Sequence, residues 1–208
     1  MTSPSPRSYR WLFWALALGG TALDQASKYG VFRWLYHGGA GGKWEVVPGV
    51  FRLVAGYPGD ADPGGWLSPL RTLSGPVLPA VNKGAVFGLG NGWEGGANLI
   101  FTVISLVAAV AIICWSTRRT TARDWLLCAS LGLILAGTLG NLYDRVVFNG
   151  VRDFLYFYWI DWPVFNVADS CLVCGAFLLL GHAFFGKGEP EPARPATQAA
   201  TSGAAAHE

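Results

Sequence analysis

The sequence predicts a mainly α-helical membrane protein, with four transmembrane helices and a small β-rich segment outside the membrane. Of its 208 residues, 52% are hydrophobic and 13% are charged, and this charged share is about half of the roughly 25% that soluble domains carry. The charges lie in short polar segments between long apolar blocks, which is typical of a polytopic membrane protein. A net charge of +2 is too small to indicate a basic binding face, so no nucleic-acid partner is expected.

The first apolar block runs from Trp11 to about Val31, after a short tail of residues 1–10 that contains Arg7 and Arg10. Its length is close to the ~20 residues that cross a ~30 Å hydrocarbon core as a helix. A cleaved signal peptide is the alternative, but no small-residue cleavage site follows the block. Basic residues before a first span favour a cytoplasmic tail.

Residues 33–96 are expected to lie outside, on the side of the membrane opposite the cytoplasm. Gly- and Pro-rich stretches surround a strand-like run from Trp44 to Val54, which predicts a small β-rich element with a flexible insertion. The next two apolar blocks, residues 97–116 and 125–143, carry no charge and are the second and third spans. The loop between them holds three arginines, and the positive-inside rule therefore places this loop in the cytoplasm.

Residues 145–164 are aromatic and partly alternating, and they predict a strand pair or a surface loop outside the membrane, on the side opposite the cytoplasm. The fourth span covers residues 165–185 and returns the chain to the cytoplasm. The Pro-, Ala- and Thr-rich tail, residues 187–208, is expected to be disordered there. Residues 11–186 therefore form one four-span membrane domain.

Polar side chains in three of the spans are expected at one depth, in the outer half of the membrane. Ionisable residues inside a span are costly and indicate a functional site. Side chains three, four or seven positions apart share a helix face, and the sets are Asp24 with Lys28, Gly137 with Asn141 and Asp144, and Asn166 with Asp169. The alternative is a structural role, as interhelical hydrogen bonds or as an interfacial Asp144–Arg145 salt bridge.

Asp169 has no lysine or arginine in its own span, and a buried acid of this kind requires a proton or a second acid that shares one. Asp153, in the aromatic segment before the fourth span, is the candidate partner, although a solvated loop aspartate is the alternative. Two adjacent carboxylates titrate as a coupled pair, which leaves one acid and one base near neutral pH. Aspartic proteases use this arrangement to activate water.

Four segments resemble, in order, the signature blocks of lipoprotein signal peptidase, also called signal peptidase II. They are residues 23–28 (LDQASK), 82–88 (NKGAVFG), 140–154 (GNLYDRVVFNGVRDF) and 165–170 (FNVADS). The resemblance covers about residues 10–186. It implies an aspartyl endopeptidase of the bacterial inner membrane, with four transmembrane helices, a small periplasmic β-cradle, and no cofactor or metal. Its implied partners are diacylglyceryl-modified prolipoproteins, cut before the lipidated cysteine, together with membrane lipids and globomycin-type cyclic peptides, and a monomer is expected.

The same resemblance assigns residue roles by motif position. The catalytic pair falls on Asp153 and Asp169. The residues that match family positions lining or bracing the site are Asp24, Lys28, Asn82, Gly84, Asn141, Asp144, Arg145, Asn166 and Ala168. The sequence departs from the family pattern in Lys83, in Val86, and in an extra Gly- and Pro-rich stretch of about residues 56–80, which is either a lid extension or a tether without a role.

Other functions are compatible with part of the pattern. A proton-coupled carrier would explain Asp24 and Asp169 inside the membrane, but not Asp153 in a water-facing segment. A structural scaffold would explain none of the carboxylates.

The remaining candidate residues predict no further site. Cys171 and Cys174 form a CxxC inside an apolar helix with no second ligand pair, which argues against zinc. All four cysteines are expected to be apolar packing residues. His182 is expected at the cytoplasmic interface.

Overall fold

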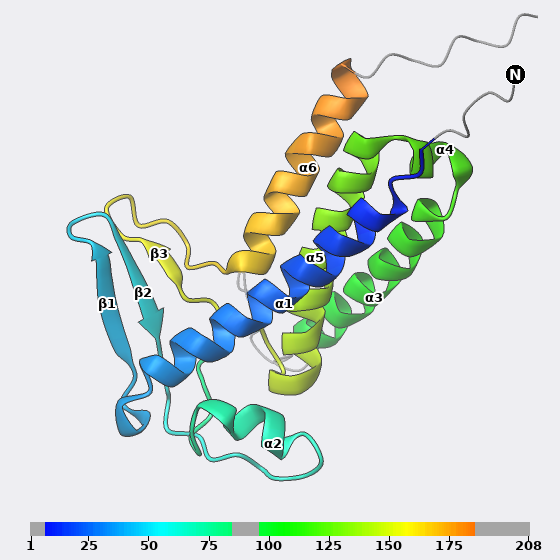
Figure 1. The fold of residues 1–208 in the computed structure, drawn as a ribbon. Helices are drawn as coiled ribbons and strands as arrows, with labels where there is room; N and C mark the ends of the chain where they lie inside the picture. Colours follow the sequence, from blue (N-terminus) through cyan, green and yellow to red (C-terminus); the bar gives the residue numbers. More distant parts are fainter. Residues whose placement is uncertain (1–6, 85–95, 186–208) are drawn as a thin grey trace, which may run out of the picture.

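The computed structural model describes residues 7–84 and 96–185. The predictions for most of the tail 1–10, for Val86 and for residues 187–208 concern residues outside these ranges. Within them, four long helices form a bundle beside a three-stranded sheet (Figure 1). The helices are α1 (Arg10–Trp34), α3 (Gly96–Ser116), α5 (Trp125–Phe148) and α6 (Val167–Phe185).

Three helices of the described residues, α3, α5 and α6, are long and apolar enough to cross a membrane. Helix α1 has 25 residues but is less apolar, since it carries two arginines together with Asp24 and Lys28. Asp24 and Lys28 are fully buried, so these two charges are withdrawn from lipid by the neighbouring helices. The mainly α-helical membrane fold is confirmed, and the count of four spans stays a prediction.

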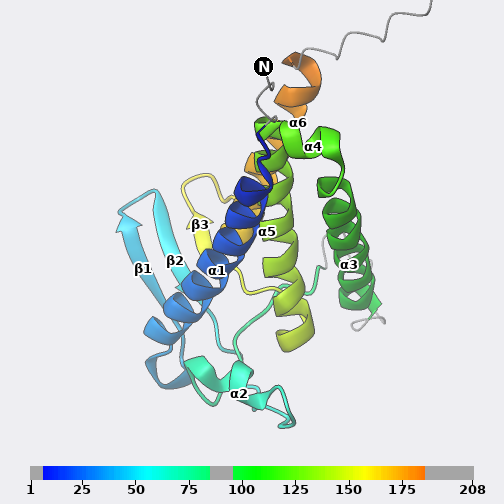
Figure 2. The ribbon, with the colours of Figure 1, turned by 45° about the vertical axis from the view of Figure 1, so that its right-hand side comes forward.

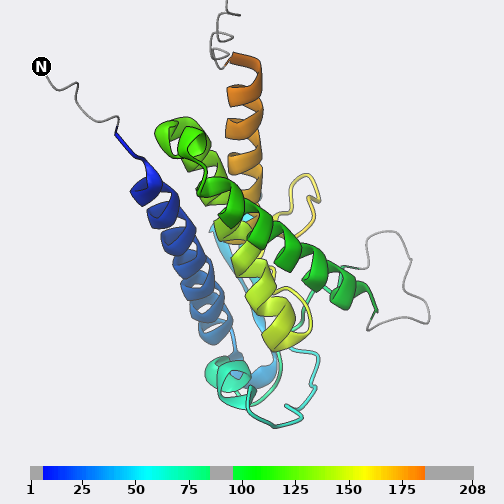
Figure 3. The same cartoon turned by 90° about the vertical axis from the view of Figure 1, so that its right-hand side faces the viewer.

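Helix α5 is the centre of the bundle and contacts α1, α3 and α6, with α1 and α3 on different sides of it (Figures 2 and 3). In the 18-residue apolar stretch of α5, 61% of the residues are buried, whereas 17% are buried in the corresponding stretches of α3 and of α6. Glycines permit this contact: a Cβ on Gly137 would lie 2.2 Å from the carbonyl oxygen of Ala168 on α6. A Cβ on Gly132 would lie 2.8 Å from the carbonyl oxygen of Phe13 on α1. Small residues of this kind favour close helix packing in lipid.

The turn from α3 to α5 contains the short helix α4 (Arg119–Arg123) and lies at the end of the bundle away from the sheet, here called the loop end (Figure 1). Asp124 caps α5 by accepting a hydrogen bond from the backbone N–H of Leu127 at 2.9 Å. The other oxygen of Asp124 lies 2.5 Å from Nε2 of His182. This contact joins the end of α6 to the start of α5.

The sheet lies at the opposite end, here called the sheet end. Strands β1 (Gly42–Val47), β2 (Phe51–Ala55) and β3 (Leu155–Phe157) are antiparallel in the order β1-β2-β3. Leu53 and Ala55 of β2 pack with Phe32 of α1 and with Phe154. This apolar cluster fixes the sheet to the end of α1, so the prediction of a β-rich element in residues 33–96 is confirmed.

The segment after the third span differs from the prediction. Helix α5 continues to Phe148, and residues 145–164 then supply the single strand β3 rather than a strand pair. β3 is the last strand of the sheet. Leu155 pairs with Leu53 of β2 on one side, and on the other side both of its backbone groups bond to Phe165 in an isolated bridge. The partner strand of β3 is therefore β2, residues 51–55, from a distant part of the chain.

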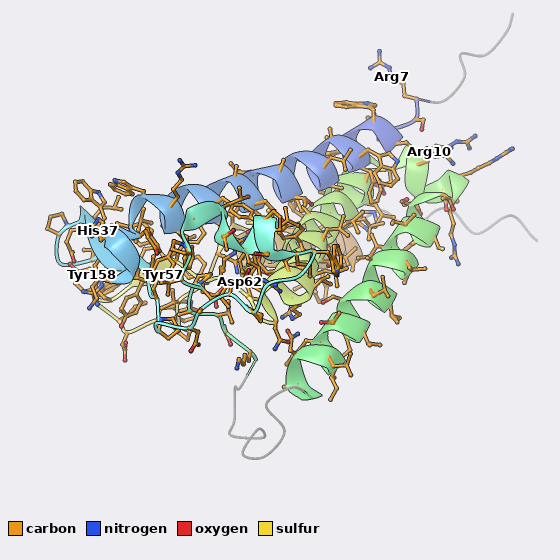
Figure 4. All side chains as sticks on the ribbon, turned by 90° about the horizontal axis from the view of Figure 1, so that it is seen from below. Arg7, Arg10, His37, Tyr57, Asp62 and Tyr158 are labelled. Carbon is orange, nitrogen blue, oxygen red and sulfur yellow. The ribbon has the colours of Figure 1, made fainter. Side chains whose placement is uncertain are left out.

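Residues 56–80, here called the insertion, have their own hydrogen bonding. The two ends of the insertion are joined by a hydrogen bond from the Ala80 N–H to the Gly56 carbonyl oxygen at 2.8 Å. Between these ends lie the short helices α2 (Ser68–Arg71) and η2 (Thr72–Ser74). The Tyr57 hydroxyl donates to the Phe32 carbonyl oxygen of α1 at 2.6 Å. Figure 4 shows the insertion, with Tyr57 and Asp62 labelled, across the sheet end. The segment expected as a flexible insertion is thus packed against the bundle.

Candidate active site

A small cavity at the sheet end is bounded by α5, α6 and the extended segments around residues 82–84 and 151–153. Its volume is about 70 Å³, which exceeds the minimum that one water molecule requires. The lining residues are Asn82, Gly84, Asn141, Arg145, Val151, Asp153 and Asp169. All except Val151 are residues that the sequence singled out.

Asparagine amides connect the two carboxylates of this cavity. Asn166 donates from Nδ2 to Oδ1 of Asp153 at 2.7 Å and from its backbone N–H to Oδ2 of Asp169 at 3.1 Å. Asn141 Nδ2 donates to Oδ1 of Asp169 at 2.8 Å. Asn82 Nδ2 donates to Oδ2 of Asp153 at 3.1 Å. Each carboxylate therefore accepts two N–H donors, and both line one cavity.

Local hydrogen bonding places Asp169 in the first turn of α6. The Asn166 Oδ1 atom accepts from the Asp169 backbone N–H at 2.9 Å, while the Asp169 carboxylate accepts from the backbone N–H of Asn166. This reciprocal arrangement is a capping box, which satisfies free N–H groups at a helix start. A carboxylate in the first turn also interacts favourably with the helix dipole.

Asp153 lies on an extended segment that is paired on both sides. Val151, before it, exchanges two backbone hydrogen bonds with Asn82, at 2.7 and 2.9 Å. Phe154, after it, donates its N–H to the Phe165 carbonyl oxygen at 3.0 Å. These contacts bring residues 82, 153 and 166 together although they are far apart in the chain.

The pKa of Asp153 is raised to about 6, chiefly by burial and also by the nearby charge of Asp169, against the opposing hydrogen bonds from Asn82 and Asn166 and the charge of Lys28. Loss of hydration disfavours the charged form of a carboxyl group, as does a second negative charge nearby. With this pKa, Asp153 gains or loses its proton close to neutral pH. Groups that act as general acids or bases have pKa values in this range.

A cluster of fully buried charges lies against the cavity, here called the charge cluster (Asp24, Lys28, Asp144 and Arg152). Lys28 Nζ lies 2.8 Å from Oδ2 of Asp24 and 3.4 Å from Oδ2 of Asp144. Arg152 NH2 lies 2.8 Å from Oδ1 of Asp144. The two acids and two bases balance, as buried charges require. Lys28 also donates to Oδ1 of Asn141 at 3.2 Å, which joins the cluster to the cavity.

The partner of Asp144 corrects one expectation. The alternative of an Asp144–Arg145 salt bridge is wrong, because Asp144 pairs with Arg152. Arg145 instead lines the cavity, and its guanidinium carbon lies 5.5 Å from the Phe101 ring centre on α3. Neighbouring residues on a helix point in different directions and do not face each other.

Arg152 and Gln25 are two members of this region that the sequence reasoning missed. Gln25 Nε2 donates to Oδ2 of Asp24 at 2.9 Å and to Oδ1 of Asp144 at 3.2 Å, and its Oε1 accepts from Arg152 NH2 at 2.9 Å. Both residues lie inside the motifs at 23–28 and 140–154. Their place beside Asp24 and Asp153 is the signal in the sequence that points to them.

Ala168 and Gly84 act through their backbones. The Ala168 N–H donates to Oδ1 of Asp24 at 2.9 Å, so α1 and α6 meet at a hydrogen bond to a buried carboxylate. The Gly84 N–H donates to Oδ1 of Asn82 at 2.9 Å. Gly84 has a φ of 81°, and a Cβ there would lie 2.6 Å from the Phe101 ring, so both its conformation and its surroundings favour glycine.

The four cysteines are free, and Cys128 is buried in the apolar core. Cys114 and Cys174 are exposed on the surfaces of their helices, whereas Cys171 is partly buried. Among residues 7–84 and 96–185, no group of three or more histidine, cysteine, aspartate or glutamate side chains is arranged to hold a metal ion.

The sequence and the fold are similar to those of known proteins. A family model described as signal peptidase (SPase) II matches residues 77–185. The lipoprotein signal peptidase of Rhodopirellula baltica is 38% identical over 190 residues, which cover 83% of this chain and 71% of the relative. That of Aeromonas hydrophila is 34% identical over 177 residues, covering 84% of this chain and 88% of the relative.

A solved structure described as a bacterial membrane enzyme superposes with a TM-score of 0.66, at 22% identity, over 88% of this chain and 99% of the other. This likeness supports the membrane fold described above. The family model covers more than half of the chain, and the two relatives extend the similarity over most of its length. The chain therefore belongs to the signal peptidase II family, the membrane proteases that remove signal peptides from prolipoproteins.

Proposed function

We propose that this protein is an aspartyl endopeptidase that removes signal peptides from diacylglyceryl-modified bacterial prolipoproteins, cutting before the lipidated cysteine. Membership of the signal peptidase II family supports the substrate class. The observation that carries the mechanism is the cavity that Asp153 and Asp169 both line, with room for a water molecule.

In the proposed reaction, Asp153 is the protonated partner and Asp169 is the general base. The raised pKa of Asp153, about 6, supports this division of roles. Asp169 takes a proton from the bound water as its oxygen attacks the scissile carbonyl carbon, and Asp153 donates its proton to the carbonyl oxygen. The tetrahedral gem-diol then collapses: the C–N bond breaks, the leaving amine receives the proton held by Asp169, and one hydroxyl proton returns to Asp153.

The remaining predicted site residues are proposed to position this pair. Asn82, Asn141 and Asn166 donate to the carboxylates, which fixes their orientation in the cavity. Arg145 supplies positive charge to the lining, where it would attract a substrate carbonyl oxygen. The residues proposed to brace the site from behind are Asp24, Lys28, Gly84, Asp144 and Ala168.

We also propose that residues 11–186 form the peptidase domain, in the bacterial inner membrane, with both termini in the cytoplasm and the site toward the periplasm. Arg7 and Arg10 lie at the loop end, away from the sheet (Figure 4), as does the arginine-containing turn at α4. Basic residues at one end of a bundle favour the cytoplasmic side. We further propose that the protein is a monomer, that it contacts membrane lipids, and that it binds globomycin-type inhibitors.

The decisive experiment is cleavage of a purified lipidated precursor by Asp153→Asn and Asp169→Asn variants of the full chain. Each variant should lose about 10²–10⁴-fold in kcat, the usual contribution of a general acid or base. The matched control is Asp161→Asn, since Asp161 is an exposed aspartate outside the cavity. Wild-type cleavage by either site variant at equal expression would refute the pair. A carrier, by contrast, predicts neither precursor accumulation on depletion nor globomycin binding.

A further inference from the structure

A second and larger cavity lies at the sheet end, here called the insertion cavity. Its volume is about 310 Å³, which is in the range of small-ligand sites. Its walls are the insertion, residues 78–83 and the last residues of α5. The proposed cleavage reaction does not use this cavity, and the insertion that forms it departs from the family's sequence pattern.

The insertion cavity and the catalytic cavity share one wall. Asn82 lines the catalytic cavity and donates to Asp153, whereas Val81 and Lys83 line the insertion cavity. Asn82 pairs with Val151 through both of its backbone groups, so this stretch is strand-like and successive side chains point to opposite sides. An extended polypeptide advances about 3.3 Å per residue. A chain cut in the catalytic cavity therefore reaches the insertion cavity within a few residues.

Lys83 and Asp60 give the insertion cavity its available charges. Both line it, and in the described part of the chain neither forms an ion pair. The third charged residue, Arg71, is held by Oδ1 of Asp62 at 2.7 Å and by the carbonyl oxygen of Gly64 at 2.6 Å. Arg71 therefore braces the insertion, while the exposed Lys83 is the cation that a ligand meets.

We propose that the insertion cavity binds the polypeptide segment that follows the lipidated cysteine of the substrate, and that Lys83 favours acidic side chains in that segment. The inference rests on the proposed function. The signal peptide and the acyl chains are apolar and stay in the membrane, whereas the segment after the cysteine is polar and leaves it. The insertion lies at the end of the bundle where that segment would emerge, across one strand-like wall from the catalytic cavity.

The test compares three lipidated substrates of the purified full chain in nanodiscs. Two carry either glutamate or lysine at the positions two to four residues after the cysteine, and the third ends directly after the cysteine. Wild type should favour the glutamate substrate by about two- to fivefold in kcat/KM, the range expected of one solvent-facing ion pair. Lys83→Glu should reverse this preference and leave the truncated substrate unaffected. Asp60→Asn should widen the wild-type preference.

Lys43→Glu is the matched control, because Lys43 is an exposed lysine on β1 outside the insertion cavity, and it should preserve the preference. Equal cleavage of the glutamate and lysine substrates by wild type would overturn the inference, as would an equal effect of Lys83→Glu on all three substrates. A Lys83 effect that follows the anionic lipid content of the nanodisc, truncated substrate included, would assign the cavity to a lipid headgroup instead. If wild type cleaved none of the substrates, the proposed function itself would fail.

Discussion

Replacing Arg152 with glutamine tests whether the charge cluster holds the site together. The guanidinium is fully buried, donates to both carboxylate oxygens of Asp144 at 2.8 and 3.1 Å, and stacks 4.0 Å from the Phe148 ring centre. Without it, the buried carboxylates of Asp24 and Asp144 face Lys28 alone. The cluster then carries one uncompensated negative charge.

Removing one partner of a buried ion pair destabilises a protein by about 3–5 kcal/mol, because the other charge remains buried without compensation. In a chain of this size, 1 kcal/mol corresponds to roughly 2–4 °C in the melting midpoint. The midpoint of Arg152→Gln in detergent should therefore fall by roughly 6–20 °C. The tryptophans provide the fluorescence signal for this measurement.

A second variant separates the electrostatic effect from loss of packing. The double variant Arg152→Gln, Asp144→Asn removes one charge of each sign. The remaining pair, Asp24 and Lys28, then has no net charge. The double variant should melt above Arg152→Gln although it carries one substitution more. Additive losses from the two single variants would refute the reasoning, since they would mean that the two charges do not depend on each other.

Three further outcomes are expected. The kcat/KM of wild type should decline as pH rises above about 6, because Asp153 loses its proton there; a flat profile from about pH 5 to 8 would contradict its role as the acid. Gly137→Ala should cost about 1–3 kcal/mol of stability by forcing α6 away from α5, whereas Gly19→Ala, with no atom near its Cβ, should be neutral or stabilising. Tyr57→Phe should cost about 1 kcal/mol by removing the hydrogen bond to the Phe32 carbonyl oxygen, and an unchanged melting midpoint would argue against this anchor.

The fold class can be predicted from the sequence because it depends on local properties of the chain. Apolar blocks of about 20 residues predict membrane helices whatever their neighbours are. Helical spacing likewise predicts that Asn141 shares a helix face with Asp144, and Asn166 with Asp169, because it depends only on positions within one helix. The strand-like pattern from Trp44 to Val54 is also a local property, and these residues form most of β1 and β2.

The contacts between these elements could not be predicted from the sequence, and only the tertiary structure shows them. Asp144 has an arginine beside it in sequence, but its buried partner is Arg152, eight residues further on, because adjacent side chains diverge on a helix. The two aspartates that line one cavity are brought together by Asn82 and Asn166, which come from different parts of the chain.

The sequence by itself thus determined a membrane-embedded helical protein and the residues from which its candidate site is built. The tertiary structure decided how the buried charges pair, where α5 ends, and that residues 56–80 pack against the bundle and form a second cavity beside Asn82. The physical reason is that apolar periodicity acts within one element. Charge compensation and cavity shape arise only where several elements meet, and there burial leaves each polar group few possible partners.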